Sequence, residues 1–160
     1  MNGELEELYQ TVILDHSKRP RNFGELLDAT ARVTGDNPSC GDEIQLGVKL
    51  GADGRIEDVK FTGHGCAISQ ASASLMTIKV KGQGIDRARE LIGALRRLVT
   101  TDDPPAIDQL GDLALLQGVR KFPQRVKCAM LAWRALEQAL LENEAGRSGG
   151  LVSTETQEGG

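Results

Sequence analysis

The chain has 160 residues, of which 39% are hydrophobic, 26% are charged and 3% are aromatic, and its net charge is −4. This composition predicts one compact domain with enough apolar material for a core. It argues against a protein that binds nucleic acid, because the chain lacks both an excess of basic residues and aromatic side chains on which bases could stack. No apolar run reaches the roughly 20 residues that a membrane span needs, so we expect a soluble protein.

The first part of the chain predicts one helix and three strands. Apolar residues at helical spacing predict an amphipathic helix over residues 4–15. Alternating apolar and polar residues predict a half-buried strand over 43–50, and after a short turn the chain returns as a hairpin partner over 55–62. Ile56 is one place out of this alternation, which indicates a β-bulge. A third strand is expected through Arg32-Val33-Thr34.

The chain after Cys66 is predicted to be helical. We expect helices over about 67–80, 85–99, 110–117 and 123–143. Strands followed by helices predict an α+β fold, in which helices pack on one face of a small antiparallel three-stranded sheet.

Two stretches are predicted to lack regular structure. Thr100 to Pro105 contains two prolines and is expected to be a loop. After Asn143 the composition turns to Gly, Ser, Thr and Glu, which predicts a disordered tail over 144–160 and a single domain over 1–143.

The residues that carry chemistry are Cys40, Cys66 and Cys128, together with the carboxylate of Asp42. Three thiols and one carboxylate are ligand types that a tetrahedral Zn²⁺ ion accepts. An odd number of cysteines argues against a disulfide framework, and the acidic N-terminus does not look like a signal peptide, so we expect a reduced, cytoplasmic protein. None of the spacings is a local C-x₂-C pair, so spacing alone leaves open the alternative that these are ordinary core cysteines.

The local sequence around each cysteine favours a reactive site. Glycines flank Cys40 and Cys66 and would let a partner approach the sulfur closely. Cys66 directly precedes one predicted helix, and Cys128 follows Pro123 near the start of another, so we expect both helix dipoles to lower the pKa of these thiols. Cys40 lies on a loop between strands, from which a sulfur is released more easily than from a helix start, so we expect Cys40 to be the reacting thiol.

These motifs resemble the IscU/SufU family of iron–sulfur cluster biogenesis proteins over roughly residues 4–142. The resemblance is carried by the three cysteine contexts and by Asp15-His16-Ser17-Lys18-Arg19-Pro20-Arg21-Asn22. Two departures from the scaffold branch favour the SufU branch. Lys127 stands where scaffold proteins carry a histidine, and the segment before it lacks the chaperone motif Leu-Pro-Pro-Val-Lys. The long separation between Cys66 and Cys128 also matches an insertion around residues 82–120 that is typical of SufU.

The resemblance implies that Cys40, Asp42, Cys66 and Cys128 bind zinc. It also implies that Cys40 accepts persulfide sulfur from a SufS-type cysteine desulfurase and that the protein works with downstream Suf cluster-assembly proteins. Two alternatives stay open. The same cysteines could hold a [2Fe–2S] cluster in an assembly scaffold, or the zinc could be purely structural.

Three further side chains lie near these motifs. Arg125 is three residues before Cys128 on the same predicted helix face, so its guanidinium could pair with Asp42 or hold the thiolates, although a solvated surface arginine is an equal alternative. His64 is two residues before Cys66, but the resemblance gives it no ligand role and we expect a loop histidine. His16 is expected to be structural, at the turn after the first helix.

Overall fold

The fold contains a four-stranded sheet. The computed structural model describes residues 3–101, 110–144 and 150–153. The strands are β1 (Ala31–Asn37), β2 (Asp42–Leu50), β3 (Ile56–His64) and β4 (Gly150–Ser153), in the order β3-β2-β1-β4. β1 to β3 pair antiparallel, which confirms the predicted three-stranded sheet, and β4 adds a parallel neighbour to β1.

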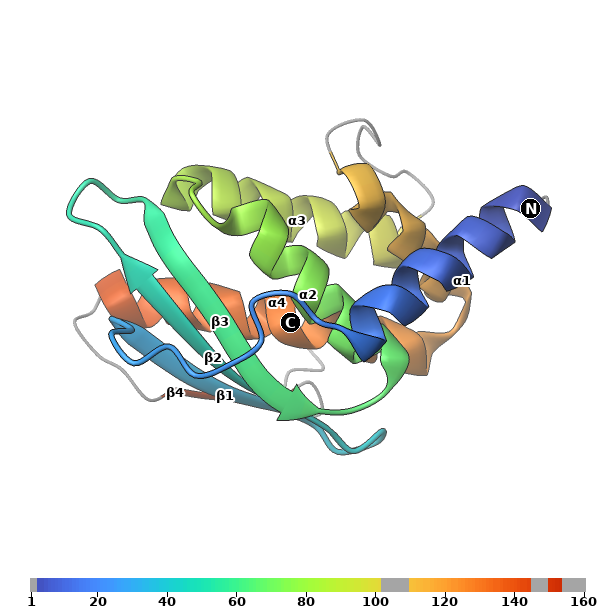
Figure 1. The fold of residues 1–160 in the computed structure, drawn as a ribbon, viewed down its shortest axis with the longest axis horizontal. Coiled ribbons are helices and arrows are strands. Elements are labelled where there is room, and N and C mark those ends of the chain that lie inside the picture. Colours follow the sequence, from blue (N-terminus) through green and yellow to red (C-terminus); the bar gives the residue numbers. More distant parts are fainter. Residues whose placement is uncertain (1–2, 102–109, 145–149, 154–160) are drawn as a thin grey trace.

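Helices pack against this sheet, as expected for an α+β fold. They are α1 (Gly3–Lys18), α2 (Ala67–Val80), α3 (Ile85–Thr100), the 3₁₀ helix η2 (Gly111–Lys121) and α4 (Pro123–Glu144). In Figure 1 they gather along one side of the sheet, and α4 contacts both β1 and β2. In the described part of the chain, no helix combines the length and the apolar character that crossing a bilayer requires.

The predicted β-bulge is confirmed. Lys49 of β2 is opposite Asp58, but the next residue, Leu50, is opposite Ile56, so Glu57 is the extra residue on β3. The bulge turns the side chain of Ile56 into the core, where it is fully buried.

The strand β4 corrects the expectation of a disordered tail for residues 150–153. It pairs with Val33–Asp36, at the outer edge of the sheet. An edge strand offers unpaired backbone N–H and C=O groups to any short extended segment, and the argument from apolar composition does not count these hydrogen bonds. Residues 145–149 and 154–160 lie outside the described residues, as does most of the predicted 100–105 loop, so the domain boundary at 143 stays a prediction.

The sheet directs the end of the β1–β2 hairpin towards α4. Residues alternate between buried and more exposed positions along both strands, with Val33 and Gly35 buried on β1 and Ile44 and Leu46 buried on β2. The same alternation buries Asn37 and Asp42, which are opposite each other as the last pair of the hairpin. Two polar side chains therefore lie at the edge of the hydrophobic core, against the helix that carries Cys128.

Candidate metal centre

Cys40 lies on the hairpin loop between β1 and β2, as predicted, and is half-buried. Its backbone N–H donates to the carbonyl of Asn37 at 3.2 Å, which holds the loop in a tight turn. Gly41 has a φ of 71°, a left-handed conformation that glycine adopts without steric cost. The turn at Gly41 returns the chain directly to Asp42, so that a ligand candidate on the loop and one on the strand are only two residues apart.

Cys66 is the N-cap residue of α2, which begins where the sequence predicted. Its sulfur accepts a hydrogen bond from the backbone N–H of Ser69 at 3.4 Å. Its own backbone N–H donates to Oδ1 of Asp42 at 2.8 Å. The start of α2 therefore positions both a thiol and the carboxylate of Asp42.

Cys128 is the sixth residue of α4 and is fully buried. The expectation that the helix dipole lowers its pKa was wrong: its hydrogen bond with Cys66 and its burial raise the pKa. For Cys66 the expected direction holds, because the hydrogen bond with Cys128 lowers its pKa to about 6, with a further contribution from the N–H of Ser69. The two neighbouring thiols are therefore unequal: their hydrogen bond favours the thiolate of Cys66 and the thiol of the buried Cys128.

Three of the four predicted ligands come together. The ligand atoms of Cys40, Asp42 and Cys128 all lie within 4.8 Å of one another. The sulfur of Cys66 adjoins this group, 3.9 Å from Oδ2 of Asp42. In a tetrahedral zinc site, with Zn–S bonds of about 2.3 Å, ligand atoms are roughly 3.5–3.8 Å apart. The described geometry therefore brings three candidate ligands together, with the Cys66 sulfur beside the carboxylate of the group.

The charge of Asp42 also fits a metal ion. Asp42 is 2% exposed, and the hydrogen-bond donors that face its carboxylate carry no positive charge: the Cys66 N–H, the Asn37 amide and the Cys66 sulfur. A buried carboxylate requires compensation of its charge. A divalent cation among these thiols would supply it.

Arg125 and His64 occupy different positions relative to the centre. Arg125 is exposed at the start of α4, and its electrostatic interaction with the three sulfurs, chiefly with the negative charge of Cys66, raises the pKa of its guanidinium. His64 points away from the thiols, since its side chain is 73% exposed and its Nε2 lies 3.8 Å from Oε1 of Glu43. Arg125 is thus within electrostatic reach of all three sulfurs, whereas His64 is outside the cluster.

Asn37, which was not among the predicted site residues, is fully buried beside the cluster. Its Nδ2 lies 3.2 Å from Oδ2 of Asp42 and 3.6 Å from the sulfur of Cys128. An asparagine directly before Pro38 is typical of a turn, so its contact with a residue 91 positions later had no local signal. The only available hint was its place in the same short motif as Cys40.

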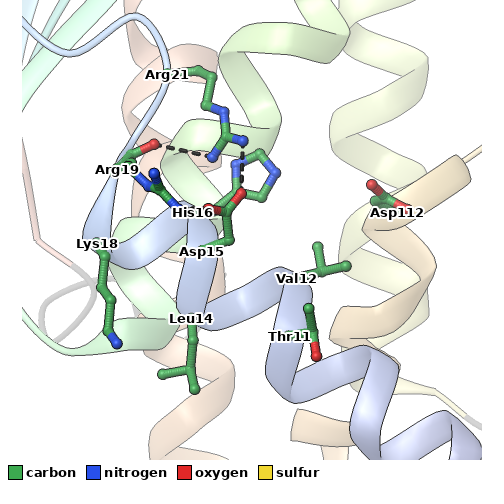
Figure 2. Close-up of a pocket in the computed structure, with 9 residues that line it drawn as sticks. All are labelled: Thr11, Val12, Leu14, Asp15, His16, Lys18, Arg19, Arg21 and Asp112. Atoms are coloured by element: carbon green, nitrogen blue, oxygen red, sulfur yellow. Dashed lines mark hydrogen bonds and ion pairs between the residues drawn. The ribbon is translucent and has the colours of Figure 1, made fainter.

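The other motif that carries the family resemblance forms a separate polar cluster at the end of α1. Figure 2 shows Asp15 facing Arg21, to which it is bound at 2.6 Å, beside a cavity of about 470 Å³. Nδ1 of His16 lies 2.7 Å from the hydroxyl of Ser74, and burial lowers the pKa of this histidine. The hydroxyl of Ser74 also accepts from the backbone N–H of Arg21 at 2.8 Å. This motif therefore ties α1 to α2 and has the structural role expected for His16.

Comparison with known proteins shows which sequences this chain is similar to. The model of the NifU-like N-terminal domain matches residues 8–147. A zinc-dependent sulfurtransferase SufU of Bacillus subtilis is 46% identical over 91% of this chain and 97% of its own length. An iron–sulfur cluster assembly scaffold protein IscU of Streptococcus pyogenes is 47% identical over 86% of each chain.

Solved structures agree with the fold. An iron–sulfur cluster assembly scaffold protein of the SUF system from Fervidobacterium islandicum superposes with a TM-score of 0.78. It is 36% identical, and the match covers 84% of this chain and 98% of that one. The predicted family and fold are both confirmed by these comparisons.

Proposed function

Since this chain belongs to the family of the NifU-like N-terminal domain, with SufU and IscU proteins among its relatives, we propose that it is a zinc-dependent sulfurtransferase. In this proposal it accepts persulfide sulfur from a SufS-type cysteine desulfurase for iron–sulfur cluster assembly. The observation that carries the proposal is the half-buried Cys40 on a hairpin loop, next to a buried carboxylate and a buried thiol. This arrangement combines a thiol that a partner can reach with ligands that stay in place.

Cys40, Asp42, Cys66 and Cys128 would hold the zinc ion. When bound, zinc keeps cysteine ligands deprotonated at neutral pH, so the site stores thiolates. This ligand set combines three soft thiolates with one harder carboxylate oxygen. It binds zinc less tightly than four thiolates would. Such a set supports a site from which one thiolate can leave.

The transfer is a thiol–disulfide type of exchange. The Cys40 thiolate attacks the terminal sulfur of a persulfide on the desulfurase, a new S–S bond forms on Cys40, and the S–S bond on the desulfurase breaks. The desulfurase cysteine leaves as a thiolate, so electrons balance without an external oxidant or reductant. Cys40 then carries the persulfide until a downstream acceptor takes the sulfur.

Arg125 would assist this step through its charge. Its guanidinium lies in the field of the three sulfurs, and a fixed cation stabilises negative charge that moves between two sulfurs. Because the side chain is exposed, it can also contact the incoming persulfide. We therefore assign Arg125 to the reaction together with Cys40.

The proposal includes its partners and its compartment. The protein would dock with a SufS-type desulfurase and pass sulfur to downstream Suf cluster-assembly proteins, without binding nucleic acid or membrane. Free thiols at the centre require a reducing environment, which we take to be the cytoplasm.

A second candidate function is an assembly scaffold that holds a [2Fe–2S] cluster on the same cysteines. The 47% identical IscU scaffold protein of Streptococcus pyogenes favours it, because that similarity is as high as the similarity to SufU. Thiolates bind iron–sulfur clusters as well as zinc. The [2Fe–2S] scaffold is therefore the alternative against which the experiment is designed.

The experiment combines metal analysis with desulfurase turnover. Protein purified without chelator should be colourless and contain one zinc ion per chain, and it should accelerate alanine release by a SufS-type desulfurase. Cys40→Ser should keep the fold and abolish the acceleration. A brown protein with iron and sulfide, and without an effect on the desulfurase, would establish the scaffold instead.

A further inference from the structure

Asn37 has a central position at the base of the metal centre. It is the last residue of β1 and is directly opposite Asp42, the first residue of β2. Opposed residues of antiparallel strands point to the same face of a sheet, and both side chains lie on the buried face, at 0% and 2% exposure. The amide of Asn37 is therefore fixed between a strand and the helix that carries Cys128.

Asn37 contacts three of the four proposed ligands. Its Nδ2 donates to Oδ2 of Asp42 at 3.2 Å and approaches the sulfur of Cys128 at 3.6 Å. Its backbone carbonyl accepts the N–H of Cys40 at 3.2 Å. One residue thus links the loop ligand, the strand ligand and the ligand on α4.

The two halves of the amide are used very differently. The NH₂ group faces two acceptors that carry negative charge when they bind a metal, and charge strengthens such hydrogen bonds. The carbonyl oxygen Oδ1 is buried and has no hydrogen-bond partner in the described part of the chain. A buried acceptor without a partner destabilises a fold. The stability of the fold alone therefore does not explain an amide at this position. Its NH₂ group, which faces the ligands, offers the explanation.

We propose that Asn37 is a positioning residue of the metal centre. Its NH₂ group holds the Asp42 carboxylate and the Cys128 sulfur in ligating geometry, so that these two ligands stay in place while Cys40 reacts. The proposal rests on the zinc site described under the proposed function, and not on the sulfur transfer itself. Hydrogen bonds from neighbouring residues that orient metal ligands commonly change metal affinity by about 10- to 100-fold.

The decisive variant is Asn37→Leu. Leucine has the same number of side-chain heavy atoms, but it removes both the donor and the unpaired acceptor. We expect the folded variant to bind Zn²⁺ about 10- to 100-fold more weakly than the wild type in competition with a chelator. Loss of the donor to the buried Asp42 carboxylate also lowers the stability of the metal-free protein, so the distinguishing readout is affinity. A merely structural asparagine would give lower stability with unchanged zinc affinity.

Cobalt gives a spectroscopic test of the same geometry. With Co²⁺ in place of Zn²⁺, the thiolate-to-cobalt absorption bands of Asn37→Leu should shift from those of the wild type. The matched control is Asn22→Asp, which removes an amide donor that binds the Thr77 hydroxyl at 3.0 Å, away from the cysteines. This control should keep the wild-type affinity and spectrum. Wild-type affinity and an unchanged cobalt spectrum in folded Asn37→Leu would overturn the proposal.

Two further measurements make every outcome decisive. If Asn37→Leu does not fold, the side-chain amide of Asn37 is followed by ¹⁵N NMR in the wild-type chain, where its protons should shift downfield when zinc is added. Resonances that do not move would overturn the proposal. If the wild-type protein itself binds no zinc, both the proposed metal centre and the proposed role of Asn37 are refuted. If the variant binds zinc as the wild type does, only the role of Asn37 is refuted.

Discussion

The candidate ligands come from two regions that are built in different ways. Cys40 is half-buried on a four-residue hairpin loop, and its backbone is held by one hydrogen bond to Asn37. Cys128 is fully buried inside α4, in the same core cluster as Trp133. The centre therefore joins a ligand that a partner can reach to a ligand that is part of the hydrophobic core.

This difference teaches how one site can both hold a metal and release a thiolate. Moving Cys128 would disturb the packing of α4, whereas Cys40 is only partly buried against the core and moving it displaces mainly a short loop. Cys66 is intermediate, since it caps α2 but is half-buried. We therefore expect sulfur transfer at Cys40, the cysteine whose movement disturbs the least packing.

The largest expected effect is a difference in the free energy of unfolding between variants of the two regions. In metal-free protein, Cys128→Ser should lower the free energy of unfolding by about 1–3 kcal/mol, because it replaces a sulfur at a fully buried position with a smaller hydroxyl that costs more to bury. The matched variant Cys40→Ser should change it by less than about 0.5 kcal/mol, as is usual at a partly exposed loop position. Urea denaturation measures both values. Equal losses would show that the loop is as firmly packed as the helix.

The next effect concerns the carboxylate that lies between the two regions. A Cβ atom at Gly65 would collide with Oδ1 of Asp42 and with the Ser69 hydroxyl, so Gly65→Ala should displace the carboxylate. Overpacking of this kind typically costs about 1–3 kcal/mol, which corresponds to roughly tenfold or more in zinc affinity. Gly93→Ala is the control, because its Cβ would meet no atom within 4 Å. Chelator competition that gives the same affinity for both variants would contradict the placement of Asp42.

The smallest effect concerns Arg125, at the exposed side of the centre. Arg125→Gln should slow persulfide acceptance severalfold and leave the zinc content unchanged, because the guanidinium acts on sulfur charge from a solvent-exposed position. Arg125→Lys, which keeps the charge, should recover part of the rate. The check is to measure the rate of persulfide acceptance at increasing salt concentration. Salt should slow this rate for the wild type and affect Arg125→Gln less. An equal salt response would leave Arg125 as a surface arginine.

The sequence predicted the features that depend on local pattern. The start of α2 at Ala67 follows from Gly65 and the capping Cys66, and the bulge at Ile56 follows from a break in alternation. The loop position of Cys40 follows from its place between two strands. Each of these depends on neighbours within a few residues, which the sequence displays directly.

The features that were missed depend on contacts between distant residues. β4 forms because an edge of β1 accepts it, and the pKa of Cys128 is raised because Cys66 and the core surround it. Asn37 reaches Cys128 across 91 positions, although its local sequence indicates only a turn. Composition and periodicity do not encode such pairings, which arise only when the sheet and α4 are packed together.

The most direct test of this account is to map the persulfide. The protein would be incubated with a SufS-type desulfurase and cysteine, the thiols blocked, and the modified cysteine identified by mass spectrometry. The account predicts an added sulfur on Cys40 and none on Cys66 or Cys128, with no persulfide in Cys40→Ser. A persulfide on Cys128 or Cys66 in the wild type, or undiminished sulfur uptake by Cys40→Ser, would contradict the assignment of sulfur transfer to the hairpin loop.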